Sequence, residues 1–154
     1  MRYFLIDRID ELKRFAYAKG RKCITLSDDC FEHHFPGQPV FPGALLIEGL
    51  AQLGGALMEI SLHQEGAHHP RCVLSKVEAK FRDFARPGDV LELHCEVLSH
   101  HEDSARVRGV VRREGKDITE ATLLFIVLRI DDAALEASRQ QFLDTLTRNT
   151  RFVE

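Results

Sequence analysis

The sequence lacks an excess of basic charge, because its 154 residues contain 21 lysine and arginine residues and 24 aspartate and glutamate residues, for a net charge of −3. General nucleic-acid binders usually carry a strongly basic face, so we expect no nucleic-acid partner. The N-terminal segment MRYFLIDRIDELKR also lacks the uninterrupted run of about 7–15 apolar residues that a secretory signal needs. We therefore expect a cytoplasmic protein.

Metal-binding motifs and domain boundaries are missing as well. The four cysteines have no CxxC spacing, and the eight histidines include three adjacent pairs but no HExxH pattern. Side chains that are neighbours along a strand point in opposite directions, so these pairs do not predict a metal site. No linker, internal repeat or low-complexity tract divides the chain. We predict reduced thiols, no metal, no organic cofactor and a single domain over residues 1–154.

One segment is apolar on nearly every side. Residues 44–62, ALLIEGLAQLGGALMEISL, contain only Glu48, Gln52 and Glu59 as strongly polar side chains. A helix of this kind lies either in a membrane or inside a protein. Two acids and three glycines argue against a membrane span. The pattern therefore predicts a long buried helix that a curved sheet surrounds.

The sheet is predicted from alternating apolar and polar residues. Residues 71–81, 89–100, 105–115 and 116–130 each alternate over much of their length and are bounded by turn residues. Four such strands in a row favour an antiparallel meander, and residues 3–9 favour a short strand. Residues 10–27 fit either a helix followed by a strand or a β-hairpin. Residues 132–147 predict a terminal amphipathic helix, whose apolar side holds Leu135, Phe142, Leu143 and Leu146.

The architecture is therefore α+β, with a core of about residues 3–130 and an added C-terminal helix within residues 131–150. A single curved layer leaves a sheet edge that must be covered. Pairing of two such edges is a common solution, so we expect at least a homodimer.

Reactive groups gather at one place, where His34 lies in a loop rich in proline and glycine and Glu48 lies on the apolar helix. A histidine in such a loop is often only solvated or bonded to the backbone. A carboxylate inside an apolar helix is costly to bury without a partner, so we expect Glu48 to be buried for a functional reason.

The segment HHFPGQPVFPGALLIEGLAQ resembles the active-site motif of the FabZ-type (3R)-hydroxyacyl-[acyl-carrier-protein] dehydratases. The matching parts are His34-Phe35-Pro36, Pro39-Val40-Phe41-Pro42-Gly43, Glu48 and Ala51-Gln52. Residues 79–89, AKFRDFARPGD, resemble a strand and turn of the same family, and the likeness spans roughly residues 3–130. The resemblance implies the hotdog fold, in which a sheet wraps a central helix, and a β-hairpin around Lys19-Gly20.

The resemblance also implies roles for the site residues. His34 would be the base, with its second ring nitrogen held by the carbonyl near Val40, and Glu48 would be the acid. Gln52 would orient Glu48, and the Gly43 N–H would bind the thioester oxygen. Each site would combine His34 of one chain with Glu48 of the other, in a homodimer that could assemble into a trimer of dimers. The implied partner is an acyl carrier protein, without nucleic acid or membrane.

A basic stretch is a candidate for carrier-protein docking. Lys80, Arg82 and Arg86 lie within seven residues, and strand alternation would put the first two on one face. The alternative is an ordinary solvated strand end.

The chain also departs from the family pattern. His33 replaces the family's glycine, and we expect it to face solvent rather than the entrance of the acyl tunnel. The C-terminal helix is an addition. We therefore expect a specialised polyketide-like or polyene pathway rather than housekeeping fatty acid synthesis.

Rival functions are separated by the same motif. Isomerising dehydratases of the FabA type carry aspartate where this chain has Glu48. Hotdog thioesterases usually lack the His-Phe-Pro-Gly loop. A non-catalytic acyl-binding subunit would need neither His34 nor Glu48.

Overall fold

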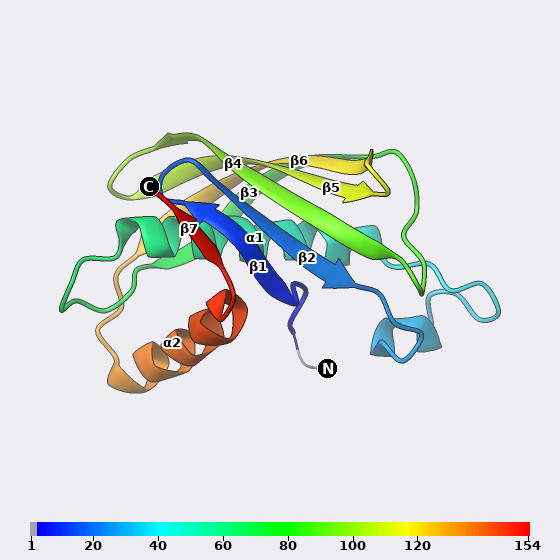
Figure 1. The fold of residues 1–154 in the computed structure, drawn as a ribbon, viewed down its shortest axis with the longest axis horizontal. Coiled ribbons are helices and arrows are strands. Elements are labelled where there is room, and N and C mark those ends of the chain that lie inside the picture. Colours follow the sequence, from blue (N-terminus) through cyan, green and yellow to red (C-terminus); the bar gives the residue numbers. More distant parts are fainter. Residues whose placement is uncertain (1–2) are drawn as a thin grey trace.

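The computed structural model describes residues 3–154, in which a long helix lies against one seven-stranded sheet (Figure 1). The elements in chain order are β1 (Arg8–Lys13), β2 (Tyr17–Cys23), the 3-10 helix η1 (Asp29–Glu32), α1 (Gly43–Leu62), β3 (Arg71–Phe81), β4 (Val90–His100), β5 (Ser104–Arg113), β6 (Lys116–Leu128), α2 (Ala133–Thr147) and β7 (Arg151–Val153). The strand order in the sheet is β3-β6-β5-β4-β2-β1-β7.

Helix α1 is the centre of the core, as its apolar sequence predicts. Leu50, Leu53, Leu57 and Met58 have no exposed surface, and the helix contacts all strands from β2 to β6. It is long and apolar enough to cross a membrane, but 67% of its most apolar window is buried inside the protein. Burial of most of its surface explains why the helix needs only a narrow polar face, which holds Glu48 and Gln52.

The hairpin formed by β1 and β2 corrects one expectation. Its turn lies at residues 14–16, not at Lys19-Gly20, and the Phe15 N–H donates to Ser61 Oγ of α1 at 2.8 Å. Gly20 lies inside β2, where an added Cβ would be 3.3 Å from Leu53 Cδ1 and 3.1 Å from Arg8 O. The glycine therefore lets α1 approach the sheet closely.

The order of the last strands corrects a second expectation. β4, β5 and β6 form the predicted antiparallel meander, but β3 pairs with β6 rather than with β4. Residues 82–89 carry the chain from one side of the sheet to the other. As a result β3 is an edge strand with one neighbour.

The two ends of the chain differ from the sequence prediction in part. Residues 3–7 form no strand; the Leu5 N–H donates to the Gln52 side-chain oxygen at 2.9 Å, and pairing with β2 begins only with the bond from the Asp7 N–H to Arg21 O. Helix α2 begins and ends within one residue of the predicted bounds, with Leu143 and Leu146 buried, but Leu135 is exposed. The short β7, which the sequence did not predict, pairs in parallel with β1.

Candidate functional site

The loop between η1 and α1 holds His34 in a defined orientation. Residues Phe35 and Gln38 exchange two backbone hydrogen bonds of 3.0–3.1 Å, and the Phe41 N–H donates to Ala85 O at 2.8 Å. His34 Nδ1 lies 2.8 Å from the Val40 carbonyl oxygen. Because a carbonyl only accepts, Nδ1 carries the proton and donates it. In the neutral ring, Nε2 is then free to accept a proton.

The imidazole borders a cavity of about 490 Å³ at the start of α1. Gly43, the first residue of the helix, lines it together with Phe81 and Phe84. An added Cβ at Gly43 would lie 2.7 Å from Cε1 of Phe81, so any other residue here would displace the aromatic ring. No side chain caps the helix. The positive end of the helix dipole therefore faces the same space as His34.

Glu48 lies one and a half turns further along α1 and is held by Gln52. The Gln52 amide donates to Glu48 Oε1 at 3.2 Å and to the Tyr3 carbonyl at 2.9 Å, and its own oxygen accepts the Leu5 N–H. The amide is thus fixed by the N-terminal segment and orients the carboxyl group. Glu48 itself is half-buried in the single chain, less than the expected burial.

His34 and Glu48 line different cavities within one chain. Glu48 borders a second cavity, of about 410 Å³, together with Cys72 and Val73 at the start of β3. The His34 cavity includes Phe81, at the other end of the same strand. The single chain therefore separates the two groups that the sequence motif links.

Strand β3 is also the exposed edge between these cavities. Val77 pairs with the buried Leu123 and so lies on the inner face of the sheet, yet it is 39% exposed. Phe81, on the same face, is 52% exposed. An inner-face edge that is apolar and uncovered is typical of a surface that pairs with another strand.

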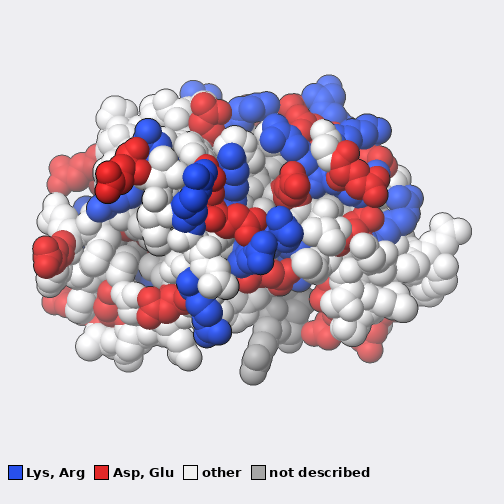
Figure 2. All heavy atoms as spheres, viewed as in Figure 1, with Lys and Arg blue, Asp and Glu red and all other residues white. Residues whose placement is uncertain are grey.

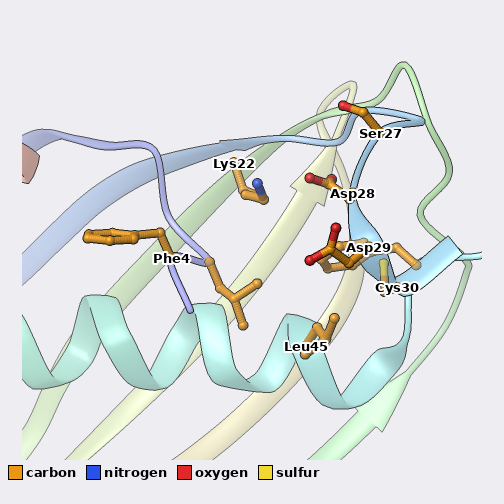
Figure 3. A pocket seen from close by; sticks show the side chains of 9 residues that line it. Phe4, Lys22, Ser27, Asp28, Asp29, Cys30 and Leu45 are labelled. Carbon is orange, nitrogen blue, oxygen red and sulfur yellow. The ribbon is translucent and has the colours of Figure 1, made fainter. Parts of the chain in front are cut away.

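A third cavity, of about 290 Å³, lies beside η1 (Figure 3). Lys22 enters it from β2, Asp28 from the loop and Leu45 from the first turn of α1. Asp28 accepts the Thr25 N–H at 3.1 Å, and Lys22 Nζ lies 3.7 Å from Asp7. These groups serve the turn and the strand, and neither His34 nor Glu48 borders this cavity.

Cys72, which lines the Glu48 cavity, is not set up as a nucleophile. Burial raises the pKa of the Cys72 thiol to about 12, so it stays protonated near neutral pH and is a poor nucleophile. Among residues 3–154, no group of three or more His, Cys, Asp or Glu side chains is placed to hold a metal ion. His33 does not border the His34 cavity, and its side chain is 91% exposed.

Of the three predicted docking residues, Lys80 and Arg82 lie near Glu120. Lys80 pairs with Glu120 across β3 and β6, and the Arg82 guanidinium donates to Glu120 at 2.9 Å. This hydrogen bond and the charge of Arg82, with a smaller contribution from Arg108, lower the pKa of Glu120. Arg86 lies apart, over the Phe84 ring at 5.5 Å. In the view of Figure 2, basic and acidic side chains are interspersed over the strands.

Some residues at these sites carried no signal in the sequence. Phe81 reaches Gly43 only because β3 ends beside the start of α1. Arg139 of α2 lines the Glu48 cavity, although it lies 91 positions after Glu48 in the chain. Contacts of this kind depend on the tertiary fold, so alternation and spacing could not have identified them.

A buried central helix, a curved sheet around it and a histidine loop at the start of the helix define a hotdog protein. Solved structures agree with this fold. A hypothetical thioesterase from Streptococcus pneumoniae with coenzyme A is 16% identical, with a TM-score of 0.62, over 81% of this chain and 88% of that chain. A sigma28-regulated virulence protein from Campylobacter jejuni is 20% identical, with a TM-score of 0.61, over 86% and 89%.

The comparisons of sequence are more specific. The family model of the FabA-like domain matches residues 1–122. The 3-hydroxyacyl-[acyl-carrier-protein] dehydratase FabZ of Nitratiruptor sp. is 36% identical over 82% of this chain and 88% of its own length. The protein of the same name from Helicobacter pylori is 38% identical, over 82% of each chain. The chain belongs to the FabZ-type 3-hydroxyacyl-[acyl-carrier-protein] dehydratase family.

Proposed function

We propose that this protein removes water from 3-hydroxyacyl thioesters of an acyl carrier protein and forms trans-2-enoyl thioesters. The observation that carries the proposal is the 2.8 Å contact between His34 Nδ1 and the Val40 carbonyl. It leaves Nε2 free beside the uncapped start of α1. A base next to a preformed anion site is what removal of a proton beside a thioester carbonyl requires.

In the first part of the reaction, His34 Nε2 takes the proton from C2 of the substrate. The electron pair of the C–H bond moves toward the thioester carbonyl, whose oxygen gains negative charge. The Gly43 N–H, at the positive end of α1, donates to this oxygen. The helix start thus lowers the energy of the charge while it develops.

In the second part, the bond between C3 and the hydroxyl oxygen breaks as the C2–C3 double bond forms. The hydroxyl group takes a proton from Glu48 and leaves as water. Gln52 holds the Glu48 carboxyl group for this transfer through its 3.2 Å hydrogen bond. Return of the proton from His34 to Glu48 through solvent resets the site, so atoms and charge balance.

The acid and base come from two chains in this proposal. Antiparallel pairing of two β3 edges around a twofold axis brings the Phe81 end of one strand to the Cys72 end of the other. The His34 cavity borders the first end and the Glu48 cavity borders the second. A homodimer of this kind would join them into two equal active sites and cover Val77 and Phe81. Assembly into a trimer of dimers is a further prediction.

The direct test is an assay with purified protein and carrier-protein thioesters. We expect 3-hydroxybutyryl-carrier protein to be converted to the enoyl thioester, and the enoyl thioester to be hydrated in the reverse direction. Mass spectrometry of the carrier protein would follow the loss of water. Release of free acid would instead indicate a thioesterase, and binding without turnover would indicate a non-catalytic subunit.

Carrier-protein docking at Lys80, Arg82 and Arg86 gives a second prediction. Carrier proteins are acidic, and surface charges of this kind mainly raise association rates. The variant Arg82→Glu with Arg86→Glu should raise the KM for carrier-protein substrates by about tenfold at low salt, and less at high salt. Turnover of N-acetylcysteamine thioesters, which have no acidic surface, should stay the same.

The matched control for docking is Arg8→Glu with Arg21→Glu. It makes the same change in charge at two arginines that lie near Asp10 on the other half of the sheet. The control should leave the KM for carrier-protein substrates unchanged. Equal losses on both kinds of substrate in the Arg82 and Arg86 variant would contradict the docking proposal.

A specialised pathway and a cytoplasmic location remain predictions. The support for the first is that α2 lies outside the residues that the family model matches. Kinetic constants for a series of acyl groups would test it, because a specialised enzyme should prefer a narrow range of acyl groups.

A further inference from the structure

The cavity beside Glu48 extends along one face of α1. Glu48, Ala51, Gly55 and Glu59 are spaced three or four residues apart and line it together. Eleven residues of α-helix separate the two acids, which corresponds to about 16 Å. Between them Ala51 and Gly55 keep this face of the helix low: an added Cβ at Gly55 would come into ordinary contact with Cys72 at 3.8 Å. The cavity is thus an elongated groove with an acid at each end.

The far end of this groove is polar. Glu59, whose side chain is 3% exposed, accepts a hydrogen bond from Arg139 Nε at 2.5 Å, and its other oxygen accepts the Cys72 N–H at 2.8 Å. The Arg139 guanidinium lies over the Phe142 ring at 4.4 Å. Phe142 in turn stacks on Phe4 at 5.3 Å. These contacts hold the end of the groove in one arrangement.

Helix α2 supplies this end, and it is firmly attached. The Asp132 side chain caps it by accepting the N–H groups of Ala134 and Leu135. Glu136 binds both the backbone N–H and the ring of His69, at 3.0 and 2.7 Å. Helix α2 lies outside residues 1–122, which the family model matches.

We propose that Glu59, Arg139 and Phe142 form the far end of the acyl-binding groove and select the acyl chain, an inference that rests on the proposed dehydratase function. The end of a long saturated chain would lie against the buried ion pair of Glu59 and Arg139. Its methylene groups would displace water from these charged groups without replacing the lost hydrogen bonds, so a long chain should bind more weakly. Shorter chains end before this point. A chain that reaches it is accepted when its end carries an oxygen, because a guanidinium has five N–H donors and Glu59 uses one.

The experiment compares carrier-protein thioesters of 3-hydroxybutyrate, 3-hydroxydecanoate, 3-hydroxyhexadecanoate and the hexadecanoate with an added terminal hydroxyl. For the native protein, kcat/KM should fall by at least about tenfold from the decanoyl to the hexadecanoyl substrate, and the terminal hydroxyl should restore part of it. In the variant Glu59→Gln with Arg139→Met, the ratio of hexadecanoyl to butyryl kcat/KM should rise. The advantage of the terminal hydroxyl should disappear.

The matched control changes α2 outside the groove. Gln140→Met with Asp144→Asn alters a hydrogen-bonded pair on the exposed side of this helix and should leave the whole profile unchanged. Phe142→Ala is a second test for the case in which the double variant does not fold. It keeps the ion pair and enlarges the end of the groove, so it should also raise the ratio of hexadecanoyl to butyryl kcat/KM. An unchanged profile in a folded variant would overturn the proposal. Absence of butyryl turnover by the native protein would instead contradict the dehydratase function.

Discussion

Replacement of His34 by alanine or of Glu48 by glutamine is expected to lower kcat/KM for 3-hydroxybutyryl-carrier protein by about 10²–10⁴-fold. Alanine removes the Nε2 that takes the C2 proton, while Val40 and the loop backbone stay in place. Glutamine keeps the shape of Glu48 and its contact with Gln52 but has no proton to give to the leaving hydroxyl. Glu48→Asp should lose about 10²-fold, since it withdraws the carboxyl group by roughly 1 Å.

The controls lie next to the site residues. His33→Ala changes an exposed imidazole adjacent to His34, and Glu65→Gln neutralises an exposed carboxylate beyond the end of α1. Both should keep the native rate. Circular dichroism and thermal unfolding would show that the inactive variants are folded. A folded His34→Ala or Glu48→Gln variant with near-native turnover would contradict the assignment of acid and base.

A mixture of the two inactive variants should regain activity. If each site combines His34 of one chain with Glu48 of the other, a heterodimer of His34→Ala and Glu48→Gln chains holds one intact site and one doubly altered site. Random exchange of equal amounts makes half of the dimers mixed, so about a quarter of the native activity is expected. The measurement is turnover after subunit exchange, with native mass spectrometry to count the mixed dimers.

The geometry of β3 makes this recovery a sharp test. The two cavities lie at opposite ends of an eleven-residue edge strand, which spans more than about 30 Å. A site within one chain would have to bring these ends together. Mixed dimers without any activity would therefore show that both groups act within one chain, and that the paired β3 edges do not form the site.

The site motif was predictable because it depends on local sequence. Pro39, Pro42 and Gly43 restrict the backbone so strongly that the loop and the start of α1 follow from their order. The contact of His34 with the Val40 carbonyl, six residues away, was implied by the resemblance to the FabZ-type motif, and the structure contains it. Gln52 lies one helical turn after Glu48, and their 3.2 Å contact follows from helix geometry alone. For the same reason the bounds of α1 and α2 were close to the predicted ones.

The strand order was not predictable from alternation. Alternation shows which residues of a strand face the core, but two strands with the same pattern fit equally well beside β6 or beside β4. The glycine in β2 was taken for a turn because its real role, close contact with Leu53 of α1, depends on a residue 33 positions away. The spacing of residues along the chain does not indicate which distant residues come into contact in the fold.

The sequence by itself thus determined the apolar helix, the alternating strands that pack on it and the spacing of Glu48 and Gln52, since each depends on residues within a few positions. The geometry of the His34 loop came from the resemblance to a known motif. Only the tertiary structure decided that β3 is an exposed edge and that the two reactive groups lie at its opposite ends. It alone also decided that Arg139 of α2 meets Glu59 of α1. These relations depend on how distant segments pack against one shared core, and packing is a property of the whole chain.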